Sequence, residues 1–257
     1  MPIQKKTLIM KLHKLIALSF LLLWVQISFA QETKKVLDLS VYDSWEKIDN
    51  QAITDKGNYI SYEVNPQEGD GKLYFFETQT SQAQAFNRGQ KAKFSPNSDF
   101  AVFEIVPFAD SVRQAKLDKK KEDEMPKDSL GIFIFENKQL ITKTNLKSFK
   151  LPKEESSWFA YMIEPEADDS TSNEKKKSKD KDFPKTATLV IFNPISQTEH
   201  QFDSIAEYDI SRDGQTVSFI KFRNDSLRES SVFVFDTKKE ELTEIFKKTG
   251  IAKKITA

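Results

Sequence analysis

Cysteine is absent from this chain of 257 residues, and glycine is scarce at seven residues. A chain without thiols has no disulfide framework, no cysteine nucleophile and no thiolate metal site. A serine nucleophile elbow, Gly-x-Ser-x-Gly, requires two closely spaced glycines so that the chain can turn sharply beneath the serine. The glycines include no such pair, nor a Walker A loop or a dinucleotide-binding fingerprint; they stand at positions 57, 69, 71, 89, 131, 214 and 250.

Histidine is equally scarce. His13 lies in the first thirty residues, which leaves His200 as the one imidazole of the remaining chain. A single histidine cannot build a histidine-rich metal site, and without an elbow serine it has no nucleophile to activate. We therefore expect His200 to be a surface or turn residue.

Adjacent carboxylates are the remaining candidates for acid–base chemistry or cation binding. Neighbouring residues on a strand point to opposite faces, so such pairs do not converge on one substrate atom. No segment has the alternating oxygen ligands and fixed glycine of a calcium loop. The sequence therefore predicts no catalytic, cofactor-binding or metal-binding residue among the pairs Glu154-Glu155, Asp168-Asp169 and Glu240-Glu241.

The N-terminus has the pattern of a secretory signal peptide. Four lysines precede the apolar run 15–29, which closes with the small-x-small tripeptide Ser28-Phe29-Ala30. This pattern predicts cleavage after Ala30, so that residues 1–30 are removed. An uncleaved membrane anchor is the alternative, for which the run is short. We expect a periplasmic or extracellular protein with no membrane attachment after cleavage.

The charge of the remaining chain argues against nucleic acid as a partner. Residues 1–30 contain four lysines and no acid, so their removal from 39 basic and 39 acidic residues leaves a formal charge of −4. A mildly acidic protein lacks the basic surface that phosphate backbones require.

The stretch 204–250 shows a repeating unit most clearly. Strand-like runs surround the turn Ser211-Arg212-Asp213-Gly214, and another strand ends at Asp236-Thr237. Gly214 supplies the positive φ of a tight turn, and Ser211 and Asp213 can bond to nearby backbone groups.

Three earlier stretches repeat this unit more loosely. Their turns are Thr54-Asp55-Lys56-Gly57, Ser95-Pro96-Asn97-Ser98 and the segment near Pro152. Without insertions the period is about 40 to 45 residues, the size of a four-stranded blade. The sequence therefore predicts an all-β fold, an incomplete β-propeller of about four such blades. The expected ranges are an opening segment 31–50, repeats at about 51–86, 87–143, 144–203 and 204–250, and the start of a fifth repeat at 251–257.

Charged insertions interrupt the second and third repeats, at 110–128 and 164–185. We expect solvated loops there, with room for a short helix in the first, because charge blocks usually form solvated faces. The alternative is that they rim a cavity or contact a partner. The aromatic clusters 74–76, 133–135 and 233–235 alternate with period two, which favours packing between blades over stacking on bases.

The order of these motifs resembles a known family. The segments Asp43-Ser44-Trp45-Glu46-Lys47-Ile48, Thr54-Asp55-Lys56-Gly57 and Pro66-Gln67-Glu68-Gly69-Asp70-Gly71 are similar to the N-terminal propeller of secreted bacterial serine peptidases of the prolyl oligopeptidase family. Within that family the sequence resembles the dipeptidyl peptidase and acylaminoacyl peptidase forms, especially those from Bacteroidetes. The likeness extends from about Val36 to the end of the sequence.

The resemblance implies a propeller that covers a following α/β-hydrolase domain and restricts access to small peptides. The hydrolase domain carries the Ser, Asp and His of the triad, and no part of it matches this sequence, so no catalytic residue is assigned. The propeller glutamates that hold a substrate amino terminus in some members have no matching motif here. The implied role is a non-catalytic gating scaffold whose partner is the hydrolase domain, with peptide substrates reached through it and no cofactor. The alternative is a stand-alone periplasmic propeller, similar to TolB-type repeat domains, that binds a protein or envelope partner.

Expression of the whole chain in a Gram-negative host tests the signal peptide. We expect a periplasmic product that begins at Gln31, because signal peptidase cuts after the small-x-small motif. Mass spectrometry of the fractionated product measures this. An Ala30→Arg variant is the control and should retain the N-terminal residues, whereas an uncut wild-type product in the cytoplasm would contradict the prediction.

Overall fold

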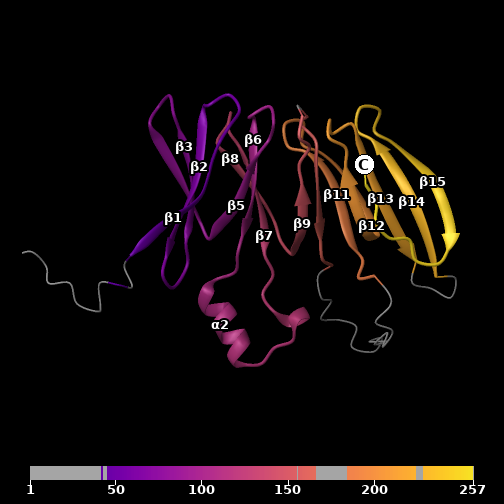
Figure 1. Ribbon diagram of the computed structural model, residues 1–257, viewed down its shortest axis with the longest axis horizontal. Coiled ribbons are helices and arrows are strands. Elements are labelled where there is room, and N and C mark those ends of the chain that lie inside the picture. The colour runs from indigo at the N-terminus through magenta and orange to yellow at the C-terminus, as the bar shows by residue number, and fades with distance from the viewer. Residues whose placement is uncertain (1–41, 43–44, 155, 166–183, 224–227, 257) are drawn as a thin grey trace, which may run out of the picture. The chain divides into compact units, whose positions relative to one another are not determined.

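The computed structural model describes residues 42, 45–154, 156–165, 184–223 and 228–256, which are coloured in Figure 1. The predicted signal peptide 1–30, much of the opening segment 31–50 and most of the insertion 164–185 lie outside the described residues. Among the described residues, no helix is long and apolar enough to cross a membrane.

The first two repeats each form a four-stranded antiparallel sheet in which strands that follow one another in sequence are neighbours. The first sheet contains β1 (Glu46–Ile53), β2 (Tyr59–Pro66), β3 (Lys72–Glu77) and β4 (Gln82–Asn87). The second contains β5 (Gly89–Phe94), β6 (Phe100–Ile105), β7 (Ser129–Ile134) and β8 (Gln139–Lys143). Strand β1 begins inside the range expected for the opening segment, because Glu46 to Asp49 pair with β2.

The last two repeats share one seven-stranded antiparallel sheet. Its strands are β9 (Leu146–Lys150), β10 (Phe159–Ile163), β11 (Ala187–Asn193), β12 (Thr198–Ile210), β13 (Thr216–Arg223), β14 (Glu229–Asp236) and β15 (Glu241–Thr249). The 13-residue strand β12 pairs with β11 up to Ile205 and with β13 from Ile205 onward. It is therefore the last strand of one unit and the first of the next.

Successive four-stranded antiparallel units are the blades of a β-propeller. The predicted all-β class and its four-stranded blades are confirmed. At each junction between units, one non-glycine residue adopts the left-handed backbone conformation. These residues are Arg88 at φ 61°, Asn145 at 58° and Ser204 at 64°.

The turn between the first two strands of the first, second and fourth units is held by a hydrogen bond to a side-chain hydroxyl. Thr54, Ser95 and Ser211 each accept a hydrogen bond from the backbone N–H five residues later, at 3.1, 3.1 and 3.0 Å. These bonds occupy backbone donors that the turn would otherwise leave unpaired. Asp213 accepts from the N–H of Gln215 at 3.0 Å, as the sequence predicts.

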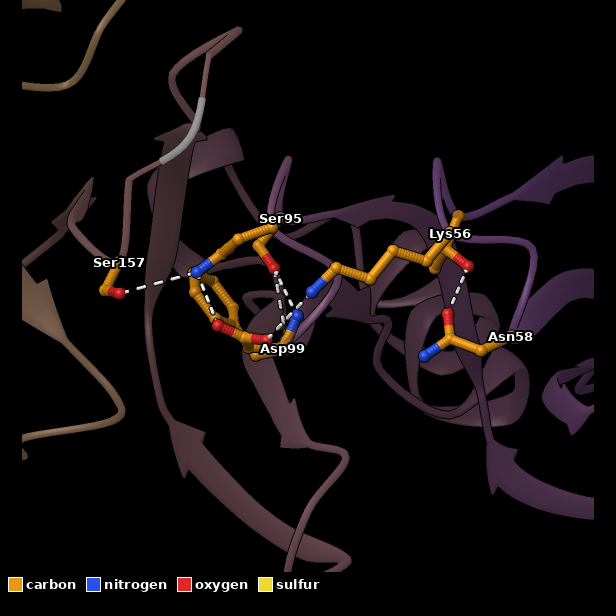
Figure 2. A network of polar contacts seen from close by, with 8 residues as sticks. Lys56, Asn58, Ser95, Asp99 and Ser157 are labelled. Carbon is orange, nitrogen blue, oxygen red and sulfur yellow. Dashed lines mark hydrogen bonds and ion pairs between the residues drawn. The ribbon is translucent and has the colours of Figure 1, made fainter.

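Figure 2 shows that these turns also contact one another across neighbouring units. Asp99 lies 3.8 Å from the Lys56 ammonium and accepts a hydrogen bond from Asn97, whose amide also reaches Ser157 Oγ at 3.5 Å. The Lys56 and Asp99 side chains are 59% and 43% exposed, and exposed pairs of this kind contribute about 0–1 kcal/mol. The contacts therefore align the turns more than they stabilise the fold.

Aromatic and aliphatic side chains between neighbouring four-stranded units form three clusters, which supply most of the buried apolar surface. Phe75 lies at the centre of the cluster between the first two sheets and is 2% exposed. Its ring centroid is 5.4–5.8 Å from those of Phe86, Phe94, Phe103, Phe133 and Phe135. The predicted inter-blade packing of the aromatic clusters is confirmed at these positions.

We expect Phe75→Ala to lower the free energy of unfolding by about 3–5 kcal/mol, since it removes a ring that is enclosed on all sides. Chemical denaturation measures the change. Phe76→Ala is the matched control, because Phe76 is the adjacent residue, faces the other side of β3 and is only partly buried. Equal losses for the two variants would contradict the assigned core.

Candidate functional site

The first charged insertion forms a helix and lies against the ends of two sheets. After β6 the chain forms α2 (Ala109–Leu117) and a short 3₁₀ helix (Glu122–Glu124) before it returns to β7. Figure 1 shows α2 beyond the ends of β5, β6 and β7. The short helix allowed for by the sequence is thus present.

Two contacts hold the start of α2 in place. The backbone N–H of Ala109 donates to Asp70 Oδ1 at 2.8 Å, so a loop of the first sheet supplies the carboxylate that caps a helix of the second repeat. The Arg88 guanidinium carbon lies 3.9 Å from the centroid of the Phe108 ring, and Nη1 donates to the carbonyl of Val106 at 2.7 Å. The helix is therefore anchored to both sheets.

A hollow of about 810 Å³ lies between α2 and the sheet ends. Apolar side chains line part of it, namely Val106, Pro107, Val112, Met125 and Pro126. Polar and charged side chains line the rest, namely Asn65, Asp70, Arg88, Arg113, Lys116 and Asp128. The first insertion is largely exposed, as expected for a solvated segment with a short helix. It also lines the hollow, as the alternative expectation of a cavity rim has it. A rim forms because Asp70 draws the helix onto the neighbouring sheet.

Carboxylates from both sheets surround one lysine next to this hollow. The backbone N–H of Lys91 donates to Glu63 Oε1 at 2.7 Å, and its ammonium donates to Glu104 Oε2 at 2.8 Å. Burial and the nearby Glu104 raise the pKa of Asp128, and Lys91 only partly offsets them. The hydrogen bond to Glu104 raises the pKa of Lys91.

We find no candidate metal site in the part of the chain that the structure describes. No group of three or more His, Cys, Asp or Glu side chains there is arranged to hold an ion. Of the carboxylates around Lys91, Glu104 pairs with its ammonium, and Glu63 accepts a hydrogen bond from its backbone N–H.

His200 lies within β12 instead of in a turn, so that part of its expected placement is wrong. Its Nε2 is 3.1 Å from Glu240 Oε2, and its side chain is 27% exposed. The ring centroid lies 4.8 Å from that of Phe235 and 5.9 Å from that of Trp158. His200 belongs to the strand because it pairs with Ile191 of β11.

The paired carboxylates do not gather at one place among the described residues. Glu154 accepts a hydrogen bond from Arg212 Nε at 2.8 Å, and Glu240 contacts His200, while Glu241 begins β15. Glu155 and the pair Asp168-Asp169 lie outside the described residues. Sequence reasoning missed Asp70 and Arg88, and the Gly69-Asp70-Gly71 loop was the available signal for the first of them.

No protein-family model and no curated protein matches the sequence. Solved structures similar to the chain include an acylaminoacyl peptidase from Pyrococcus horikoshii, at 8% identity and TM-score 0.42, over 82% of this chain and 34% of that one. The β-propeller domain of the trilobed protease from Pyrococcus furiosus is similar at 8% identity and TM-score 0.42, over 79% and 58%. A prolyl endopeptidase is similar at 12% identity and TM-score 0.44, over 80% and 30%.

The chain spans 34%, 58% and 30% of the lengths of these three structures. At such identities the likeness concerns the arrangement of strands and carries no information on activity.

Asp70→Ala should loosen the start of α2, because it leaves the first helical N–H without its acceptor. We expect a loss of about 1 kcal/mol in local stability, measured as faster hydrogen exchange over residues 109–113. Glu68→Ala, in the same loop and with the same change of charge, is the control and should leave the exchange unaltered. Unchanged exchange in Asp70→Ala would show that the helix does not depend on this contact.

Asp128→Asn should raise thermal stability at pH 7. The folded protein holds the Asp128 proton to a higher pH than the unfolded chain, whose pKa is the ordinary 3.8. Ionisation above that pH therefore favours unfolding, and the variant removes this penalty. Melting temperatures measured from pH 3 to 7 should converge at the acidic end, where both states are protonated. Asp118→Asn is an exposed control, and a lower melting temperature for Asp128→Asn at pH 7 would contradict the assignment.

Proposed function

We propose that this chain is the non-catalytic propeller portion of a secreted peptidase of the prolyl oligopeptidase family. In this role the blades form a gating scaffold beside an α/β-hydrolase domain, which supplies the triad and acts on oligopeptides. The order of motifs from about Val36 onward and the succession of antiparallel blades support the proposal. Export to the periplasm or the cell exterior follows from the N-terminal pattern.

The observation that carries the proposal is the outer strand of the fourth unit. Leu73 faces Phe86 in the register of the first unit, and Val232 faces Phe246 in the register of the fourth. Phe86 is 7% exposed and lies 5.1 and 5.0 Å from the rings of Phe103 and Phe133 in the next sheet.

The corresponding Phe246 is 49% exposed, and every residue of β15 is exposed. A large apolar side chain at a repeated docking position suits a further sheet of the same kind. This supports the role of the chain as one part of a longer propeller.

A stand-alone binding propeller is the second candidate. The hollow beside α2 favours it, because such a site can bind a ligand without any catalytic group. The two candidates differ in what the coding DNA contains after the codon for Ala257. The peptidase proposal expects further repeats followed by Gly-x-Ser-x-Gly. A stop codon there, with a monodisperse folded product, would favour the second candidate.

The purified chain should not hydrolyse chromogenic dipeptide substrates above the rate of the buffer, because its glycines form no nucleophile elbow. Release of p-nitroaniline measures turnover, and a prolyl oligopeptidase with its hydrolase domain is the positive control. Turnover that a serine-reactive phosphonate abolishes would contradict the non-catalytic role.

A further inference from the structure

The hollow beside α2 has the size and lining of a small-molecule site. Its volume of about 810 Å³ falls within the usual range of roughly 300–1,000 Å³ for ligand pockets. Val112 and Met125 contribute apolar surface, and Arg88, Arg113 and Lys116 contribute positive charge. A lining with an apolar side and a cationic side suits a ligand that has an apolar part and a negatively charged group.

The site is formed before any ligand arrives. Asp70 fixes the first backbone N–H of α2, and Arg88 stacks on Phe108 just ahead of the helix. Further along, Ala115 is 2% exposed, so the helix is also packed through its middle. A lining held in this way loses little conformational entropy on binding.

The cations of the hollow lack acidic partners. None of Arg88, Arg113 and Lys116 forms an ion pair with another described residue. Arg88 Nε is shielded from solvent and has no hydrogen-bond acceptor.

The two acids of the lining do not supply those partners. Asp70 accepts a hydrogen bond from the helix N–H. Among the described residues, neither Asp70 nor Asp128 forms an ion pair with the three cations. The hollow therefore has positive groups available to an anion.

We propose that this hollow binds a small carboxylate with an apolar body. The carboxylate lies against Arg113 and Lys116, where charge-assisted hydrogen bonds are available, and the apolar body lies against Val112 and Met125. An aromatic acid and the free carboxyl end of a short peptide both have this chemistry. The proposal is independent of the peptidase role and holds equally for a stand-alone propeller.

Three probes test whether binding depends on the ligand's carboxylate charge or on its shape. They also distinguish a peptide carboxyl end from a simple aromatic acid. N-acetylphenylalanine carries the carboxylate and a peptide group, its amide lacks the charge, and 3-phenylpropanoate lacks the peptide group. Ligand-observed NMR titration of the purified chain at low salt gives each Kd. We expect both acids to bind about tenfold more tightly than the amide. A preference for N-acetylphenylalanine over 3-phenylpropanoate identifies a peptide end as the better source, and equal affinity identifies a simple acid.

A matched pair of double variants tests the assigned residues. Arg113→Gln with Lys116→Gln should weaken binding of the acids about tenfold and leave the amide unaffected. Lys119→Gln with Lys120→Gln removes the same charge just beyond α2, outside the lining, and should keep the affinity of the unaltered chain. Equal melting temperatures confirm that both variants fold.

Filling the hollow with Val112→Trp should weaken all three probes. Equal affinity for acid and amide, equal weakening by the two double variants, or no binding of either acid at about 10 mM would each overturn the proposal.

Discussion

Burial of aromatic and aliphatic faces between successive four-stranded units is the interaction on which this structure depends. Each apolar cluster takes its residues from two neighbouring repeats, so no four-stranded unit covers both of its faces alone. The strand β6 shows the consequence, since Phe100 and Val102 pack against the following repeat while Ala101 and Phe103 pack against the preceding one. Strands covered on both faces form continuous apolar runs. Stability is then approximately a sum over units and their interfaces, and a unit without a neighbour leaves a docking side chain exposed, as at Phe246.

The scarcity of glycine constrains how the chain turns between these sheets. The last hairpin of each unit contains a non-glycine residue in the left-handed region: Ser81, Lys138, Gln197 and Glu240, at φ between 55° and 58°. This conformation costs an L-residue roughly 1–2 kcal/mol. It persists only where contacts with the surrounding structure offset that cost. Thr78 and Thr237 provide such contacts, because their hydroxyls donate to the carbonyls of Gly57 and Gly214 at 2.9 and 2.8 Å. Packing and side-chain hydrogen bonds thus perform the role that glycine has in many propellers.

Local patterns in the sequence were sufficient for the sheets but not for the site. The turn motifs at Thr54, Ser95 and Ser211 recur with the strands, since hydroxyl-capped turns and alternating apolar residues are set by nearby residues. The continuous strand β12 was beyond such reasoning, because a bend at Ser204 lets one strand serve two units. The hollow was also beyond it, since its defining contact joins Asp70 to Ala109, 39 residues apart. Contacts of that kind depend on how units pack, and the sequence of neither loop contains that information.

The hollow lies beside a group of charged side chains that interrupts the apolar pattern of the strands. A bulge in β5 places Lys91 at φ 53°, and its hydrogen bonds go to Glu63 of the first sheet and Glu104 of the second. Glu63 is only 3% exposed and accepts the backbone N–H of Lys91, whereas the Lys91 ammonium pairs with Glu104. Asp128 lines the hollow, and burial together with the nearby Glu104 raises its pKa, which Lys91 only partly offsets. Asp128 lines the hollow together with Arg113 and Lys116, which form no ion pair with another described residue. Titratable groups with a perturbed pKa are more frequent at binding sites than elsewhere. The proposed carboxylate site thus lies where the first charged insertion meets the ends of the sheets, and not within the apolar clusters that join the repeats.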